Sequence, residues 1–199
     1  LFTTRNLTLP GGLGRGTETV SLTVRTKEGC ISSPVTRKLS ILSKPNADFT
    51  ANNACVGDPV NIHGADLEPA SPASKWFWNL GDGTTSTLQD PPPHTYATPG
   101  NYDIKLVING NNGCTSDTAL LKITVKAYPF AKIGYTPQPY CENDPLTLLD
   151  SSSVDYGTVN NWTWKTSSGD FTTRNPTLPG GLGRGTETVS LTVRTKEGC

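Results

Sequence analysis

Residues 75–83 read Lys-Trp-Phe-Trp-Asn-Leu-Gly-Asp-Gly, and this stretch decides the fold. Trp76, Trp78 and Leu80 stand two residues apart, so in a β-strand their side chains share one face. Three large apolar side chains on one face predict a sandwich core, which we favour over a platform for stacking sugars. Phe77 points to the opposite face, where an exposed aromatic side chain is a candidate contact for a partner.

The same alternation continues downstream of this stretch. Apolar and polar residues alternate over residues 102–108 and again over residues 121–125, and helical periodicity is absent. The connector between them, Gly-Asn-Asn-Gly at 110–113, is rich in residues that accept a positive φ. Residues 101–125 are therefore predicted to form a β-hairpin.

The chain also repeats itself. Residues 1–30 recur almost unchanged as residues 170–199, with differences only at the first position and at Leu7, which becomes Pro176. A weaker period lies inside this one, because Cys30, Cys114 and Cys199 recur at intervals of about 85 residues. Near-identity over such a length indicates recent duplication within a longer array.

The two periods divide the chain into three predicted units. Residues 1–44 are the C-terminal half of one unit, residues 45–126 are a complete unit, and residues 127–199 lack the segment equivalent to 31–42. About seven short strands in a unit of this size are typical of an immunoglobulin-like sandwich. We therefore expect an all-β fold of tandem immunoglobulin-like β-sandwich repeats.

Composition excludes several classes of partner. Lysine plus arginine and aspartate plus glutamate each number 17, so the chain has no electrostatic reason to bind nucleic acid or an anionic membrane. No apolar run approaches the roughly 18 residues that insertion into a membrane requires. The chain contains no methionine, so we expect an internal fragment whose secretion signal lies elsewhere in the protein.

Three short motifs carry a family resemblance. Trp-Asn-Leu-Gly-Asp-Gly at 78–83 is followed by His-Thr-Tyr at 94–96 and by Pro-Gly-Asn-Tyr at 99–102. This pattern resembles the PKD (polycystic kidney disease) domain, and the resemblance covers nearly all of residues 45–126. The pair Asn79-Leu80 replaces the family's Asp-Phe without disturbing the alternation. The resemblance implies an immunoglobulin-like sandwich that is not itself an enzyme.

The cysteine placement adds a narrower resemblance. A cysteine before the second strand and a Gly-Cys in the last hairpin are similar to the PKD-type repeats of giant gliding-motility surface adhesins. That likeness implies a stalk or fibre in adhesion or gliding motility, located outside the cell or on its surface. Its partners would be neighbouring repeats of the same chain, surface polysaccharide or other adhesin copies. The alternative is a carbohydrate-binding or spacer module of a secreted hydrolase.

Five cysteines in an extracellular array predict disulfides. We expect Cys55–Cys114 and Cys141–Cys199 within units, with Cys30 left over because its partner would precede residue 1. A competing geometry stays open. In immunoglobulin topology the first and last hairpin loops lie at opposite ends of the sandwich, so end-to-end stacking would bring Cys55 near Cys199 of the next unit.

No catalytic residue, metal site or cofactor is expected. His63 and His94 are the only histidines and have no zinc-binding spacing. Asp82 between two glycines supplies one carboxylate, too few for Ca²⁺, and predicts a tight turn that bonds backbone amides instead. The sequence Asp-Thr-Ala around Thr118 resembles the O-glycosylation acceptor of Bacteroidetes-type secreted proteins.

The incomplete first and third units suggest a way for copies of the chain to join. Residues 31–42 of one chain are the strand that residues 127–199 of another chain lack, so strand addition between copies is a hypothesis. One feature opposes it, because residues 1–30 would arrive attached to the donor strand and duplicate strands that the acceptor already has.

Overall fold

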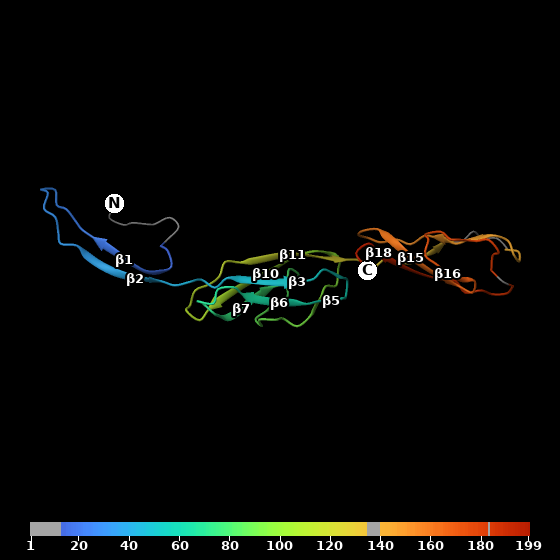
Figure 1. Cartoon of the computed structure of the whole chain (residues 1–199), viewed down its shortest axis with the longest axis horizontal. Helices are drawn as coiled ribbons and strands as arrows, with labels where there is room; N and C mark the ends of the chain where they lie inside the picture. Colours follow the sequence, from blue (N-terminus) through green and yellow to red (C-terminus); the bar gives the residue numbers. More distant parts are fainter. Residues whose placement is uncertain (1–12, 135–139, 183) are drawn as a thin grey trace.

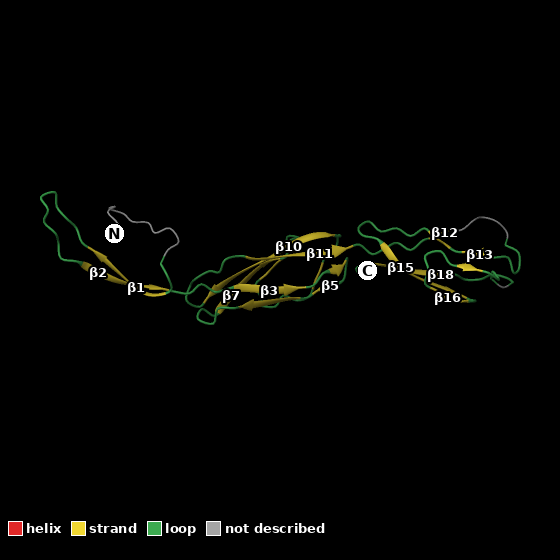
Figure 2. Ribbon diagram, turned by 45° about the horizontal axis from the view of Figure 1, so that its top comes forward, coloured by secondary structure: helices red, strands yellow, loops and turns green. Residues whose placement is uncertain are grey.

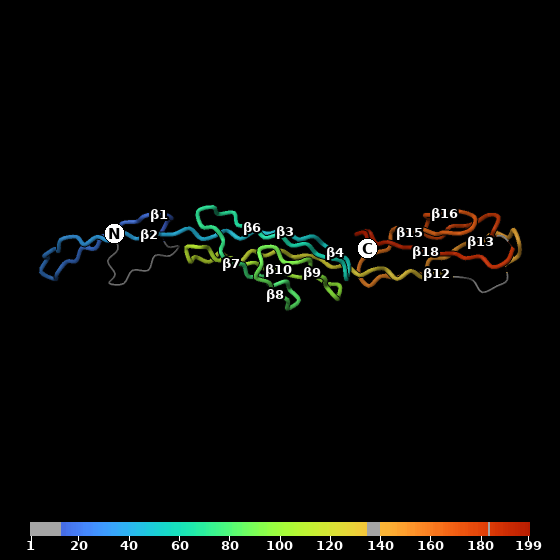
Figure 3. The backbone as a smooth tube through the Cα atoms, turned by 90° about the horizontal axis from the view of Figure 1, so that it is seen from below, coloured from blue at the N-terminus to red at the C-terminus, as the bar shows by residue number. Residues whose placement is uncertain are grey.

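The computed structural model describes residues 13–134, 140–182 and 184–199 as strands, turns and loops without a helix (Figure 2). Three parts follow one another along a single long axis (Figures 1 and 3): an N-terminal segment, described over residues 13–44; a central region, residues 45–126; and a C-terminal region, described over residues 127–134, 140–182 and 184–199. The chain's C-terminus lies back at the junction with the central region. The predicted all-β fold is confirmed.

The central region is a sandwich of two layers. One layer is a five-stranded sheet in the order β4-β11-β10-β7-β8, and the other consists of the pairs β3-β6 and β5-β9. The strands are β3 (Ala47–Ala51), β4 (Ala54–Cys55), β5 (Pro59–Val60), β6 (Ile62–Asp66), β7 (Ala73–Asn79), β8 (Thr85–Ser86), β9 (His94–Thr95), β10 (Gly100–Gly110) and β11 (Ala119–Lys126). Strands β10 and β11 form the predicted hairpin.

The core of the central region lies between these layers. Trp78 is 3% exposed and Leu80 is buried, as their alternation predicts, and Trp76 is partly buried against the same core. The Phe49 ring from β3 meets the Trp78 ring edge-on at 5.1 Å between centroids, which joins the two layers. Phe77 lies on the outer face of β7 and is 44% exposed.

The C-terminal region repeats this pairing with fewer strands. It has two strand pairs, β12-β14 and β13-β17, and a three-stranded sheet, β16-β15-β18, which correspond to β3-β6, β5-β9 and β8-β7-β10. The strands are β12 (Ile133–Gly134), β13 (Leu146–Thr147), β14 (Leu149–Asp150), β15 (Val159–Thr166), β16 (Gly169–Phe171), β17 (Thr177–Leu178) and β18 (Ser190–Thr195). Among the described residues, β18 pairs with β15 alone. The core contains Trp164 and three leucines, Leu146, Leu148 and Leu178.

The N-terminal segment is an extended hairpin. Strand β1 (Gly16–Leu22) pairs antiparallel with β2 (Val35–Ile41), from Gly16 opposite Ile41 to Leu22 opposite Val35. Several apolar side chains of the hairpin are exposed, because the described residues form no second layer over them: Val20, Leu22, Val24, Ile31, Val35 and Leu39.

Candidate functional site

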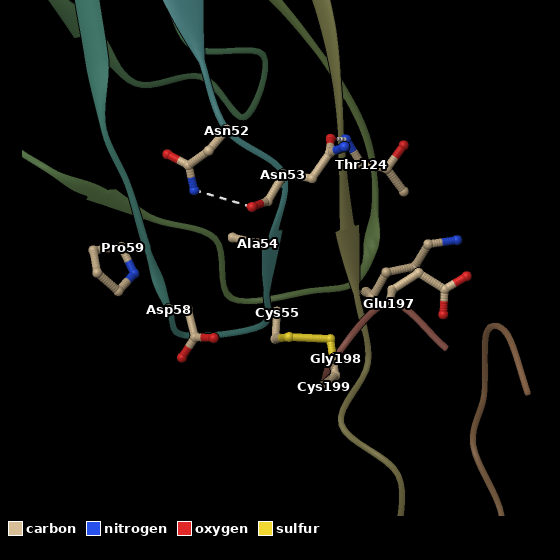
Figure 4. A pocket seen from close by; sticks show the side chains of 11 residues that line it. Asn52, Asn53, Ala54, Cys55, Asp58, Pro59, Thr124, Glu197, Gly198 and Cys199 are labelled. Atoms are coloured by element: carbon tan, nitrogen blue, oxygen red, sulfur yellow. Dashed lines mark hydrogen bonds between the residues drawn. A yellow bond between two sulfur atoms is a disulfide. The ribbon is translucent and has the colours of Figure 1, made fainter. Parts of the chain in front are cut away.

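The most specific feature of the chain is a covalent junction between two regions. Cys55 at the end of β4 is bonded to Cys199 of the C-terminal region, with 2.03 Å between the sulfurs and 5.7 Å between the Cα atoms (Figure 4). Strand β4 runs parallel to the end of β11, where Cys55 stands opposite Lys126. The bridge therefore lies where the central region ends and the next region begins.

The predicted pairing within units is wrong. Cys30, Cys114 and Cys141 are free thiols in this structure, and the bond runs from Cys55 to Cys199, the competing geometry. Cys55 lies beside the end of β11, whereas Cys114 precedes the start of β11. The strand between these positions is roughly 25 Å long at ~3.3 Å per residue. A disulfide spans about 7 Å at most between Cα atoms, so Cys55 and Cys114 cannot meet.

The same separation keeps Cys141 from Cys199. Cys141 lies near Arg184, whose Nε bonds the neighbouring Glu142 carboxylate at 2.7 Å. The chain then runs through β18 before it reaches Cys199, so Cys199 is at the other end of the region. Both within-unit pairs fail for one reason, namely that the first loop and the last hairpin lie at opposite ends of a sandwich.

Polar contacts reinforce the disulfide junction. The Tyr128 hydroxyl of the connecting segment reaches both Asp58 carboxylate oxygens at 2.9 Å, and this hydrogen bond raises the pKa of Tyr128. The Val56 amide donates to the Lys126 carbonyl at 2.9 Å. These contacts attach the connecting segment to the loop that carries Cys55.

A shallow groove borders the bridge, as Figure 4 shows. Its walls come from Asn52, Asn53 and Thr124 of the central region and from Glu197 of the C-terminal region. The asparagines already bond backbone, since Asn53 Oδ1 accepts from the Thr124 amide at 2.8 Å and Asn52 Nδ2 donates to the Asn53 carbonyl at 3.0 Å. We interpret the groove as a seam between packed regions.

The opposite end of the central region also has a joint. Asn112 Nδ2 donates to the Ser43 carbonyl at 2.9 Å, and Lys44 forms an ion pair of 2.9 Å with Asp117. The hairpin turn between β10 and β11 therefore contacts the preceding linker. These residues could not be predicted as partners from the sequence, because nothing in their spacing marks them.

The Gly-Asp-Gly motif forms the predicted turn. Asp82 accepts a hydrogen bond from the Thr84 amide at 2.9 Å and lies 2.7 Å from His94 Nε2. Burial alone would raise the pKa of Asp82, but the hydrogen bonds from Thr84 and His94 outweigh it and hold the pKa below its ordinary value. Asp82 thus connects two of the motifs that are separate in the sequence.

Tyr96 makes a second internal link. Its hydroxyl donates to the Leu80 carbonyl at 2.8 Å, and the side chain is almost fully buried. Burial and the nearby Asp82 raise the pKa of Tyr96 to about 12. The hydroxyl therefore keeps its proton and remains a donor. The hydrogen bonds of Asp82 and Tyr96 thus stabilise the fold of the central region.

The remaining candidate residues lie on the surface. Phe77 borders a shallow hollow beside Thr85 and Thr87, and its role as a partner contact stays a prediction. Thr118 is exposed in the loop before β11, so its hydroxyl is accessible for O-glycosylation. His63 lies 3.7 Å from the Asp90 carboxylate on the surface.

The described residues form neither a metal-binding cluster nor a membrane-spanning helix. They contain no group of three or more His, Cys, Asp or Glu side chains arranged to hold a metal ion. None of them forms a helix of the length and apolarity needed to cross a membrane.

Residues 42–125 match the PKD domain family. A microbial collagenase of Vibrio alginolyticus is 33% identical over 85 residues, which cover 42% of this chain and 10% of the collagenase. Collagenase ColA of Bacillus cereus is 38% identical over 88 residues, which cover 43% of this chain and 9% of ColA. Among solved structures, the PKD1 domain of the Vibrio cholerae metalloprotease PrtV matches with 25% identity and a TM-score of 0.37, over 42% of this chain and 98% of that domain.

The chain thus corresponds to about a tenth of the length of either collagenase. The resemblance inferred from the three motifs is confirmed at the level of the PKD domain. The narrower likeness to gliding-motility adhesins stays a prediction.

Proposed function

We propose that this chain is a non-catalytic spacer of a larger extracellular protein, built from PKD-type repeats that stack end to end. The observation that carries the proposal is the Cys55–Cys199 bond, because it ties the far end of one sandwich to the near end of the next. A bond in that position restricts bending between the two regions. The regions follow one axis (Figure 1), as a spacer requires.

The disulfide also supports an extracellular location. Disulfides persist in oxidising compartments and are rare in the cytosol. The Cys55–Cys199 bond closes a segment of 144 residues, so the protein's shape depends on an oxidised state. Whether the protein is attached to a cell surface is a further expectation that the adhesin hypothesis makes.

Two settings suit a spacer, and the accessory module of a secreted hydrolase is the better supported. Both collagenases resemble this chain only through a segment of the length of one PKD domain. We infer that this chain, as such a module, would serve the architecture or substrate contact of an enzyme and leave catalysis to other parts.

An adhesin stalk is the second candidate setting. The near-identity of residues 1–30 and 170–199 favours it, because a long fibre is built by duplicating one unit. Reading the gene on both sides of this segment separates the settings. A neighbouring hydrolase domain supports the accessory module, and many further copies of the repeat support the stalk.

Solution scattering tests the spacer itself. A compact globule of this length would have a radius of gyration of about 16 Å. We expect a clearly larger value and an elongated distance distribution for the oxidised chain. The matched control is the Cys55→Ser/Cys199→Ser double variant, which should populate bent shapes. An oxidised chain with the compact value would refute the spacer.

Binding assays test the carbohydrate-binding form of the alternative. Sedimentation with insoluble cellulose, chitin or collagen should leave the chain in solution if it acts only as a spacer. Binding that Phe77→Ala abolishes would instead support a substrate-contact role for the outer face of β7.

A further inference from the structure

The charged side chains of the central region are divided between its two faces. Residues 45–126 contain four lysines and no arginine. All four lysines stand on the five-stranded sheet, at positions that alternate with core residues and therefore face outward. They are Lys75 of β7, Lys105 of β10, and Lys122 and Lys126 of β11. The strands of this sheet contain one carboxylate, Asp103, which lies 3.8 Å from Lys122, so the outer face is positively charged.

The other layer of the sandwich has the opposite charge. Strands β3, β5, β6 and β9 contain no lysine or arginine. Asp48 of β3 is exposed there, and so is Asp90, whose carboxylate accepts from the Gly64 amide of β6 at 3.1 Å. The neutrality of the whole chain therefore coexists with one locally positive face. A field of that kind attracts anions to the five-stranded sheet and away from the other layer.

An apolar strip crosses the positive face between its lysines. Phe77 of β7 stands directly opposite Val107 of β10. Leu120 of β11 stands opposite Lys105 and is therefore diagonal to Val107. Side chains in these cross-strand positions are roughly 5–8 Å apart. Phe77 is 44% exposed and Leu120 is 60% exposed, so the strip is open to solvent.

Two lysines flank this strip along the strand direction. Lys75 precedes Phe77 by two residues on β7, and Lys105 precedes Val107 by two residues on β10. Because β7 and β10 are antiparallel, the two lysines lie on opposite sides of the Phe77–Val107 pair. Residues two apart on a strand are roughly 6–7 Å apart. A ligand that covers Phe77 and Val107 therefore has a cation at each end.

Hydroxyl groups border the strip at the edge of the sheet. Phe77 lines a shallow hollow with Thr85, Ser86 and Thr87, which come from β8 and the residue after it. Thr85 and Thr87 are exposed. A hydroxyl both donates and accepts hydrogen bonds. An exposed aromatic ring beside hydroxyls suits a ligand that combines an apolar surface with hydroxyls of its own.

The C-terminal region shows that the sandwich does not require these side chains. Strands β15 and β18 pair in the register of β7 and β10, since Trp164 stands opposite Leu191 as Trp78 stands opposite Leu106. In the order Lys75, Phe77, Lys105 and Val107, the corresponding residues are Asn161, Thr163, Ser190 and Thr192. All four corresponding residues are polar and uncharged. Fold stability therefore does not account for the apolar and cationic residues of the central region.

The position of the strip favours a sugar over a peptide. An extended peptide is bound through its backbone at the edge of a sheet, and β10 lies between β7 and β11 without a free edge. A sugar ring needs no backbone partner, because its C–H face packs on apolar side chains and its hydroxyls bond polar side chains. A carboxylate on the ring adds a charge-assisted hydrogen bond to an ammonium group.

We propose that the outer face of the five-stranded sheet binds an acidic polysaccharide built from uronic acid units. One ring lies over Phe77, and carboxylates of the units on either side pair with Lys75 and Lys105. Lys122 continues the positive track onto β11. The proposal adds a ligand to the spacer function and does not depend on it.

Titration of the ¹⁵N-labelled, oxidised chain with polygalacturonate tests the proposal. The matched control is the fully methyl-esterified polymer, which has the same rings without the charge. At low ionic strength we expect chemical-shift changes on β7, β10 and β11, and binding of the ester at least tenfold weaker. Salt at about 1 M should abolish most of the binding, because the Debye length falls to about 3 Å.

Variants that introduce the residues of the C-terminal region test the side chains without disturbing the fold. Phe77→Thr should weaken binding at least fivefold, and the Lys75→Asn/Lys105→Ser double variant at least tenfold. Phe130→Ala is the control for loss of an aromatic ring, because Phe130 is 69% exposed and lies outside the sheet. The Lys38→Ser/Lys132→Asn double variant removes two exposed charges elsewhere. Both controls should bind as the wild type does.

Several outcomes would overturn the proposal. These are equal binding of the ester, equal loss in the control variants, and shift changes centred outside β7, β10 and β11. Single-stranded DNA and vesicles of phosphatidylcholine with phosphatidylglycerol are the competing polyanions. If either bound as tightly as polygalacturonate, the face would be an unselective anion site and the sugar assignment would fail. An oxidised chain that is elongated in scattering and binds no polygalacturonate would refute this proposal alone and leave the spacer function standing.

Discussion

The sequence Gly-Thr-Glu-Thr-Val-Ser-Leu-Thr-Val-Arg-Thr occurs twice, at residues 16–26 and 185–195, and forms a different strand each time. The first copy is a strand over Gly16–Leu22, where β2 pairs with it. The second is a strand over Ser190–Thr195, where β15 pairs with it. In the central region β10 has both kinds of partner and is a strand throughout, Gly100–Gly110.

This difference shows that the paired strand determines how far a strand extends. An identical residue also differs in burial, since Val24 is 58% exposed and the corresponding Val193 is 7% exposed. Val193 pairs with Trp162 and lies in the region whose core contains Trp164, whereas no second layer formed by the described residues covers Val24. Strand propensity measures the fit to such surroundings more than a backbone preference.

Loss of the C-terminal core should remove the difference in exposure between residues 190–195 and residues 21–26. Trp164→Ala removes the largest fully buried side chain of that region and should cost roughly 3–5 kcal/mol. The core of this region is small, so a loss of that size should unfold it. We therefore expect residues 190–195 to become as exposed as residues 21–26. Residue-resolved hydrogen exchange by NMR compares the amide protection of the two segments directly, because identical sequences have the same intrinsic exchange rates.

The matched variant is Trp78→Ala in the central region. The local cost should be similar, because both indole nitrogens donate to backbone carbonyls, Leu88 at 2.7 Å and Thr173 at 3.2 Å. The larger central core should nevertheless keep that region folded at a reduced melting temperature. Unchanged protection of residues 190–195 in Trp164→Ala would contradict this account.

Removal of the junction bond should have the next largest effect. The Cys55→Ser/Cys199→Ser variant should lower the free energy of unfolding of the C-terminal region by about 2–4 kcal/mol, because its unfolded chain is no longer tied at both ends. The central region should change little. Urea denaturation, followed through amide signals of each region, separates the two effects.

Cys30→Ser controls for loss of a thiol, since Cys30 forms no bond in this structure. Equal destabilisation by Cys30→Ser and by the double variant would mean that the bond is not what stabilises the C-terminal region.

The tyrosine link is present only in the central region and should have a moderate effect. Tyr96→Phe leaves the Leu80 carbonyl without its hydroxyl donor inside the protein, which should cost about 1–2 kcal/mol. The corresponding stretch of the C-terminal region, residues 178–182, contains no tyrosine, so that region should be unaffected. Thermal unfolding of wild type and variant measures the difference, and an unchanged melting temperature would show that the hydrogen bond contributes nothing net.

Much of the fold could be predicted from local pattern. The alternation of Trp76, Trp78 and Leu80 identified the core face, because a strand's period of two is read directly from sequence. The glycines and asparagines at 110–113 identified the hairpin turn, and the residues around Asp82 identified a second turn. Each of these predictions depends on residues close together in the chain.

The disulfide pairing could not be settled in the same way. It depends on which ends of two successive sandwiches meet, and that is a property of the assembled units. Spacing favoured Cys55 with Cys114, but only the direction of β11 shows that these residues lie at opposite ends. The Lys44–Asp117 and Tyr128–Asp58 contacts escaped prediction for the same reason.

The smallest expected effect is a pH dependence that differs between regions. The Asp82 carboxylate has a pKa below its ordinary 3.8, although burial alone would raise it, because Thr84 and His94 hydrogen-bond the ionised form. A depressed pKa in the folded state means that Asp82 stabilises the central region above about pH 4. That contribution is lost as the pH falls through the lower, folded-state pKa.

Asp82→Asn should therefore flatten the acid dependence of the central region and leave the C-terminal region as it is. Asp150 supplies the reciprocal control, because its pKa is also lowered: burial raises it, and hydrogen bonds from Ser152 and Arg174 outweigh that effect. Asp150→Asn should flatten the acid dependence of the C-terminal region alone. Residue-resolved chemical shifts between about pH 5 and pH 2 follow both regions in one sample, since that range covers ordinary and depressed aspartate pKa values. If either variant changed both regions equally, the two regions would be acting as one cooperative unit through the disulfide, and their separate description would fail.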